Sequence, residues 1–120
     1  MEKTFNEQQF EGLQSADTYI IKLINGINIY FDYIKEEKDE EASNLLSYIV
    51  EGIDWVNEIA ALTKDIQKEN MDDKVMSKYL DELEKNFNEG CIDKVCEILK
   101  DEILLLLGQW KHIVSNSILI

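Results

Sequence analysis

Proline is absent from all 120 positions of this chain, and only five residues are glycine. Because proline breaks helices and glycine weakens them, a chain this poor in both can form long, uninterrupted helices. Apolar residues recur at three- and four-residue intervals over most of the length, which is the period of one face of an α-helix. Runs of alternating apolar and polar residues, typical of strands, are not found. The sequence therefore predicts an all-α fold.

The helical pattern divides into four segments. Asp39 is suited to an N-cap and Gly90 to the left-handed position after a helix, and short connections make successive helices antiparallel. The corner near residues 35–41 lacks glycine, so the sequence defines its position only to within several residues. We expect a single domain, residues 1–120, folded as an up-down antiparallel bundle of four helices, three long and the third short. The expected helices cover about 6–36, 39–69, 73–88 and 91–116.

The charge balance excludes several classes of partner. Asp and Glu number 25 against 12 basic residues, all of them lysine, which gives a net charge of −13. Nucleic-acid affinity rests on basic residues that neutralise phosphates, so we expect no binding to DNA or RNA, and weak attraction to anionic membranes. The longest apolar run, residues 103–107, is far too short to span a bilayer. Residues 1–9 show no secretory signal, so we expect a cytoplasmic protein with reduced cysteines.

Residues capable of catalysis or metal binding are sparse. The only histidine, His112, lies roughly 20 Å or more from Cys91 and Cys96 if the last helix is continuous, which excludes a cysteine–histidine pair within the chain. Spacings typical of zinc, di-iron or calcium sites are absent, as are a glycine-rich phosphate loop and a nucleophile elbow. We therefore expect a protein that is not an enzyme, with no metal and no cofactor.

A surplus of apolar residues lies beside the expected core stripes. Tyr48, Trp55 and Leu62 recur every seven residues on the second helix, and Ile29 and Tyr33 lie on a comparable flank of the first. Exposed apolar strips on helices usually mark a partner groove or an oligomer interface. The alternative is that each wide stripe packs against two neighbouring helices. Tyr19 and Tyr30 of the first helix and Ile98 of the last lie on the same kind of flank, and both interpretations apply to them.

One acidic residue has an unusual position. Glu102 falls on the edge of the apolar stripe of the last helix, close to Val95, Ile98 and Leu106. A carboxylate there could pair with a lysine or line a cleft, and Glu102 is therefore a candidate binding residue. The alternative is a boundary glutamate whose carboxylate reaches water.

Two segments resemble a small helical protein family of clostridial-type bacteria without assigned function. They are residues 45–55 (LLSYIVEGIDW) and residues 93–103 (DKVCEILKDEI), the latter followed by LGQW at 107–110. The family pattern has a proline before the last leucines, which this chain lacks. The resemblance covers about a third of the chain and implies a helical fold and a bacterial origin, with no activity.

These observations favour binding over chemistry. The leading hypothesis is a protein–protein interaction module, chaperone- or adaptor-like, that uses Tyr48, Trp55 and Leu62 as anchors and an acidic rim. At the level of the fold, flagellar export chaperones are analogous, because they hold a client helix in an apolar groove. One alternative is a bundle that binds a small molecule between its helices, with Glu102 as a polar contact. A further alternative is a structural homo-oligomer formed by self-association.

Overall fold

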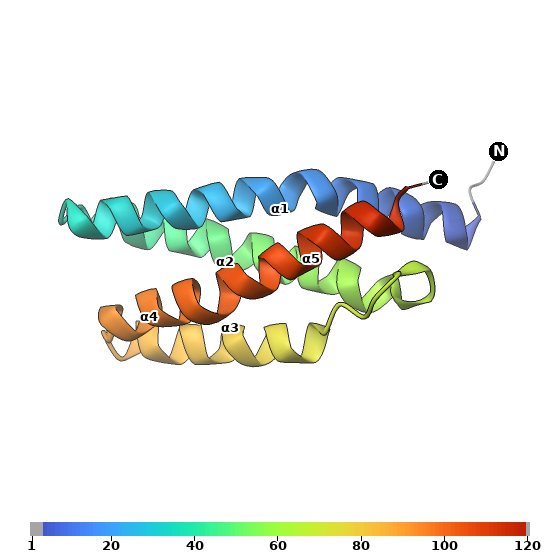
Figure 1. Cartoon of the computed structure of the whole chain (residues 1–120). Helices are drawn as coiled ribbons and strands as arrows, with labels where there is room; N and C mark the ends of the chain where they lie inside the picture. The colour runs from blue at the N-terminus through green and yellow to red at the C-terminus, as the bar shows by residue number, and fades with distance from the viewer. Residues whose placement is uncertain (1–3, 120) are drawn as a thin grey trace.

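The expected bundle of four helical rods is confirmed (Figure 1). A computed structural model describes residues 4–119 of the chain. The fourth rod is interrupted by a π-helix of five residues, here called the π-turn. The elements are α1 (Phe5–Lys35), α2 (Asp39–Leu62), a 3₁₀ turn (Lys64–Ile66), α3 (Asp73–Asn88), α4 (Ile92–Ile98), the π-turn (Leu99–Ile103) and α5 (Leu104–Ser117).

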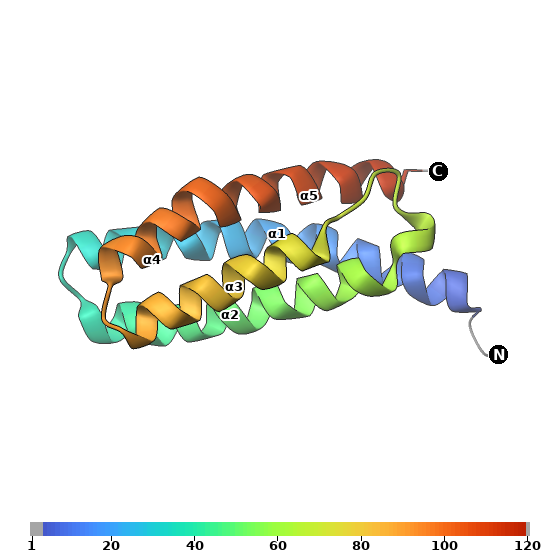
Figure 2. The same ribbon diagram turned by 90° about the horizontal axis from the view of Figure 1, so that it is seen from below.

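The rods alternate in direction and form an elongated body of 50 × 23 × 22 Å. α1 packs most extensively against α2 and also against α5, while α3 packs against α2 and α4. The α1–α2 corner and the α3–α4 corner lie at one end of the bundle, and the connection from α2 to α3 lies at the other (Figures 1 and 2). α2 therefore has a packed neighbour on each side and an outer face between them.

The α1–α2 corner turns without glycine. Glu37 adopts a left-handed backbone conformation, with φ of 58°. Backbone hydrogen bonds close the corner, since Glu36 N donates to Asp32 O at 3.0 Å and Lys38 N to Tyr33 O at 2.9 Å. Lys38 therefore takes the N-cap position of α2, where its side chain makes no capping bond, and the expected cap Asp39 is the first helical residue. Elsewhere the local signals are right: Gly90 follows α3 with φ of 75°.

Helix α2 ends at Leu62, about seven residues before the expected end. The side chain of Gln67 explains the early end. Its Nε2 donates to Ala60 O at 2.7 Å and to Thr63 Oγ1 at 2.9 Å, and its Oε1 accepts from Met71 N at 2.9 Å. The amide thus satisfies the Ala60 carbonyl, which a longer helix would have bonded to Lys64 N, and it holds the connection against the end of α2.

The core extends further around α1 and α4 than one stripe per helix. Tyr30 is only 1% exposed and Ile98 is buried, so at these two flank positions the packed alternative holds. α1 packs between α2 and α5, so its buried face is wider than the stripe of about 100° that periodicity suggests. Ile24, Phe31 and Ile34 of the expected stripe are only partly buried against this core.

The π-turn has a cause in the spacing of buried residues. Val95, Leu99, Ile103 and Leu107 are all buried and follow one another at four-residue intervals. At about 100° per residue, each interval advances roughly 40° beyond a full turn, so three in succession would carry the last residue away from the core. The wider turn, in which Leu104 N donates to Leu99 O, corrects this drift.

Candidate binding surface on helix α2

The three predicted anchors on α2 are all exposed. Tyr48 has 71% of its surface accessible, Trp55 40% and Leu62 57%. At seven-residue intervals a helix has made almost two full turns, so the three side chains form a row along one side of α2. The expected surplus of apolar surface is therefore present on this helix.

The row borders a groove between α1 and α2, here called the aromatic groove. Tyr19, Tyr48, Glu51, Gly52 and Trp55 line a hollow of about 400 Å³. Tyr19 of α1 meets Trp55 edge-on, with ring centroids 5.3 Å apart and an angle of 75° between the planes. This geometry is favourable for aromatic rings and holds Trp55 in place while leaving part of it accessible.

A glycine makes the aromatic groove possible. A β-carbon on Gly52 would lie 2.6 Å from Leu23 Cδ2 and 2.8 Å from the Tyr19 hydroxyl oxygen. Both distances are too short for real atoms, and Leu23 is buried in the core. Only glycine therefore lets Tyr19 lie directly against the backbone of α2.

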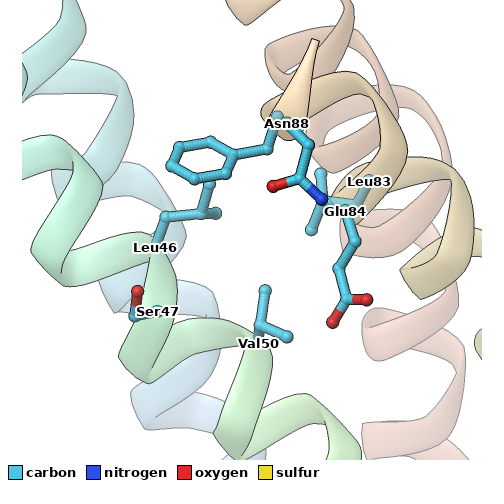
Figure 3. A pocket seen from close by; sticks show the side chains of 7 residues that line it. Leu46, Ser47, Val50, Leu83, Glu84 and Asn88 are labelled. Carbon is cyan, nitrogen blue, oxygen red and sulfur yellow. The ribbon is translucent and has the colours of Figure 1, made fainter. Parts of the chain in front are cut away.

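The opposite side of α2 carries a second hollow, here called the α2–α3 groove. One half, of about 270 Å³, is lined by Leu46, Ser47, Val50, Leu83, Glu84, Phe87 and Asn88. The other, of about 280 Å³, is lined by Val50, Glu51, Asp54, Ser77, Leu80, Asp81 and Glu84. Figure 3 shows Leu46 and Val50 of α2 facing Leu83 and Glu84 of α3 across the first half. Val50 and Glu84 line both halves, so the two hollows adjoin at these residues.

Glu51 connects the two grooves. It lines the aromatic groove and also the acidic half of the α2–α3 groove. The exposed residues Asp54 and Glu58 continue the same outer face of α2. The outer face of α2 is therefore an acidic ridge with an apolar-floored groove on either side.

The remaining predicted site residues lie elsewhere. Ile29 is 45% exposed on α1, and Tyr33 is half-buried, with the Lys38 ammonium 5.8 Å from its ring centre. Neither residue lines the aromatic groove. Glu102 lies in the π-turn, half-buried, and its Oε2 is buried without a hydrogen-bond partner among residues 4–119. The structure therefore brings together Tyr48 and Trp55 but separates Glu102 from them.

A further cleft, of about 680 Å³, lies between α1 and the fourth rod. Its apolar lining comes from Phe31, Ile34, Cys96 and Leu104, and its polar lining from Asn28, Lys35, Asp93, Glu97, Lys100 and Asp101. Burial, together with the nearby Asp93, raises the pKa of the Cys96 thiol. The thiol therefore stays protonated near neutral pH, which lowers its reactivity as a nucleophile.

Chemistry-bearing groups are dispersed over the described part of the chain. Within residues 4–119, no three His, Cys, Asp or Glu side chains come together as a metal site. His112 is exposed, with its Nε2 3.2 Å from Asn116 Nδ2. None of the helices spanning residues 5–117 combines the length and apolar character needed to cross a bilayer.

Sequence reasoning predicted neither the α2–α3 groove nor the contribution of Tyr19 to the lining of the aromatic groove. Tyr19 belonged to an expected apolar flank, but its contact with Trp55 depends on how α1 and α2 are aligned. The acidic pairs Glu51 with Asp54 and Asp81 with Glu84 are each spaced three residues apart, which places each pair on one helix face. That spacing predicts an acidic face on each helix. The two faces form the walls of a groove only because α2 and α3 lie side by side.

Fold and surface together define a small, acidic, all-α bundle with a grooved outer helix. The chain belongs to the family of the domain of unknown function DUF8042, whose model matches residues 11–113. The expected membership of a helical family without assigned function is confirmed at that level, while the bacterial source and the analogy with export chaperones stay predictions. No curated protein and no solved structure matches the chain.

Proposed function

We propose that this chain is a protein–protein interaction module whose aromatic groove binds a protein partner. The observation that carries the proposal is the row of Tyr48, Trp55 and Leu62, exposed along α2 and joined by Tyr19. Trp and Tyr are enriched among residues that dominate binding energy, because they offer a large apolar area at low entropic cost. Exposure of such a row to water is unfavourable, and a partner that covers it would remove that cost.

The charges around the row indicate the kind of partner. Glu51 lines the groove, and Asp54 and Glu58 are exposed on the same helix. With a net charge of −13, the chain repels acidic surfaces and attracts basic ones over the Debye length. The partner would therefore present apolar side chains surrounded by lysine or arginine.

The test compares substitutions on two faces. Tyr48→Ser with Leu62→Ser removes two exposed anchors of the row on α2. The control, Ile21→Ser with Leu105→Ser, removes two exposed apolar side chains on other helices. A partner recovered from source cells with the wild-type chain is purified and titrated against all three proteins. We expect the first pair to weaken binding about tenfold or more and the control to leave it unchanged.

Equal affinity of the wild-type chain and the Tyr48/Leu62 variant for the purified partner would contradict the proposal. Light scattering tests the alternative of self-association: a dimer of wild-type chains that dissociates in the same variant would assign the row to a homo-oligomer interface. The Trp55→Ala variant serves as a second probe, read together with its unfolding midpoint because Trp55 also packs on Tyr19.

A second candidate function, small-molecule binding, is favoured by the cleft of about 680 Å³ between α1 and the fourth rod. Its size falls in the range of ligand sites, roughly 300–1,000 Å³. A thermal-shift screen would identify ligands. A ligand in this cleft should protect Cys96 from alkylation while the exposed Cys91 reacts as before, and unchanged alkylation of Cys96 would place the ligand elsewhere.

A further inference from the structure

The two halves of the α2–α3 groove differ in chemistry. The first half has an apolar floor, to which Leu46 and Val50 of α2 and Leu83 and Phe87 of α3 contribute. The second half has carboxylates on both walls, Glu51 and Asp54 from α2 and Asp81 and Glu84 from α3. A ligand that fills the whole groove must therefore be apolar at one point and cationic at the next.

The four carboxylates are unpaired within the described residues. All four side chains are exposed, and in the part of the structure that is described, no lysine forms an ion pair with any of them. Four negative charges on facing helices repel one another. A bound cation would relieve this repulsion, so the walls are complementary to a basic partner.

The distance between the two halves is set by the helix. On α2, the apolar half spans positions 46–50 and the acidic half positions 50–54. Their centres are about four residues apart, which is roughly 6 Å along the helix axis. On a partner helix, residues four apart lie on one face at about the same separation.

We propose that the α2–α3 groove binds an amphipathic helix of a protein partner that carries Lys or Arg one helical turn from a large apolar side chain. The apolar side chain would enter between Val50 and Leu83, and the cation would lie among the four carboxylates. The inference rests on the proposed function only in treating the chain as an interaction module. None of Tyr48, Trp55 and Leu62 lines this groove, so either surface can fail alone.

Other occupants fit less well. An open groove between two helices is typical of helix recognition. A second copy of the chain would bring another net charge of −13 to the carboxylates. A basic helix supplies both the apolar and the cationic contact.

The test uses a synthetic, alanine-rich helical peptide of about 20 residues, long enough to be helical in water. It carries Leu and Arg four positions apart on one face. A control peptide of the same composition places each Arg two positions from Leu, on the opposite face. Fluorescence anisotropy at about 0.1 M salt measures binding. NMR signals of the Leu46, Val50 and Leu83 methyl groups and of the Tyr48 and Trp55 rings locate it.

Two chain variants with the same change in charge separate the groove from general electrostatics. The groove variant combines Glu51→Gln, Asp54→Asn, Asp81→Asn and Glu84→Gln. The distal variant neutralises two Asp and two Glu that line neither half, Asp32→Asn, Asp65→Asn, Glu69→Gln and Glu89→Gln. All eight side chains are exposed, so both variants should fold.

We expect wild-type chain and distal variant to bind the first peptide with similar affinity, and the groove variant to bind it about tenfold or more weakly. The control peptide should bind weakly to all three. Equal losses in both variants, no preference between the peptides, or shifts confined to Tyr48 and Trp55 would each overturn the proposal. The last of these outcomes would still support binding at the aromatic groove. Conversely, peptide binding that is unaffected by Tyr48→Ser with Leu62→Ser would support the α2–α3 groove as a site independent of the row.

Discussion

At the scale of single residues, burial changes the chemistry of a tyrosine. Tyr30 is enclosed by the core, and burial, with a smaller contribution from Cys96, raises the pKa of Tyr30 to about 12. A tyrosine in the unfolded chain has a pKa of about 10. The folded state therefore favours the protonated phenol, and its advantage is complete below pH 10 and disappears as the pH rises from about 10 to about 12.

The Tyr30→Phe substitution should remove this alkaline loss of stability. Near pH 7 we expect the free energy of unfolding to change by less than about 1 kcal/mol, since only the hydroxyl is removed. Near pH 11.5 the variant should be more stable than wild type by roughly 1–2 kcal/mol. Urea unfolding followed by circular dichroism at each pH measures both values. Tyr48→Phe, at an exposed position, is the control, and identical pH profiles for the two variants would show that Tyr30 is not the group responsible.

The burial and contacts of residues that depend on a neighbouring helix could not be predicted from the sequence. Periodicity placed Tyr48, Trp55 and Leu62 beside the core stripe of α2 but left open whether a neighbouring helix covers them. The structure shows that all three are exposed. Periodicity also left the burial of Tyr30 open, because the buried face of α1 is widened by the second helix against which α1 packs. The sequence did not decide whether Glu102 pairs with a lysine, lines a cleft or reaches water. Its Oε2 is buried and has no hydrogen-bond partner among residues 4–119.

At the scale of the elements, the ends that depend on local backbone chemistry were predictable. Asp72 Oδ1 accepts from Val75 N at 3.1 Å as the cap of α3, and Gly90 takes the left-handed conformation after it. The end of α2 was not predictable, because it depends on Gln67 reaching back to Ala60. The π-turn was missed as well, although the four-residue spacing of its buried residues indicates it in retrospect.

The π-turn should make the fourth rod tolerant of a deletion. Removing the exposed Lys100 shortens the wide turn to an ordinary α-helical one, and the buried positions then alternate at four and three residues, the pattern of a regular bundle helix. We expect a cooperatively folded chain whose melting temperature lies within about 5 °C of wild type. Circular dichroism during heating measures it.

The control deletes Lys22, an exposed lysine in the middle of α1, where no wide turn can absorb the change. The residues on one side of the deletion rotate by about 100°, which removes half of the α1 stripe from the core. This variant should lose cooperative unfolding. Similar melting curves for the two deletions would contradict the explanation of the π-turn by core spacing.

At the scale of the whole molecule, charge opposes compactness. The net charge of −13 is carried on a body only 23 × 22 Å in cross-section, so most carboxylates lie within a Debye length or two of one another at low salt. Acidic residues outnumber lysines by 25 to 12, so ion pairs such as Lys111 Nζ with Asp17 Oδ1 at 2.8 Å can neutralise fewer than half of them. Self-repulsion therefore lowers the stability of the folded chain.

Sodium chloride should accordingly raise the melting temperature. Between about 0.02 and 0.5 M, we expect a rise of several degrees, equivalent to roughly 1 kcal/mol, because screening shortens the reach of the repulsion. The groove variant and the distal variant each remove four negative charges, so both should melt higher at low salt and respond less to added salt. A wild-type melting temperature that falls with salt, or a groove variant with an undiminished response, would contradict this account. Calorimetric scans supply the measurement.

Glu51 belongs to the walls of both grooves, and that shared position has an energetic consequence. A cation held by Glu51 from one side withdraws that charge from a ligand on the other. Two basic ligands would then lower each other's affinity by the same factor, since thermodynamic linkage is reciprocal. Binding of one basic partner along the acidic ridge of α2 would therefore weaken binding of the other, and the two partners would compete.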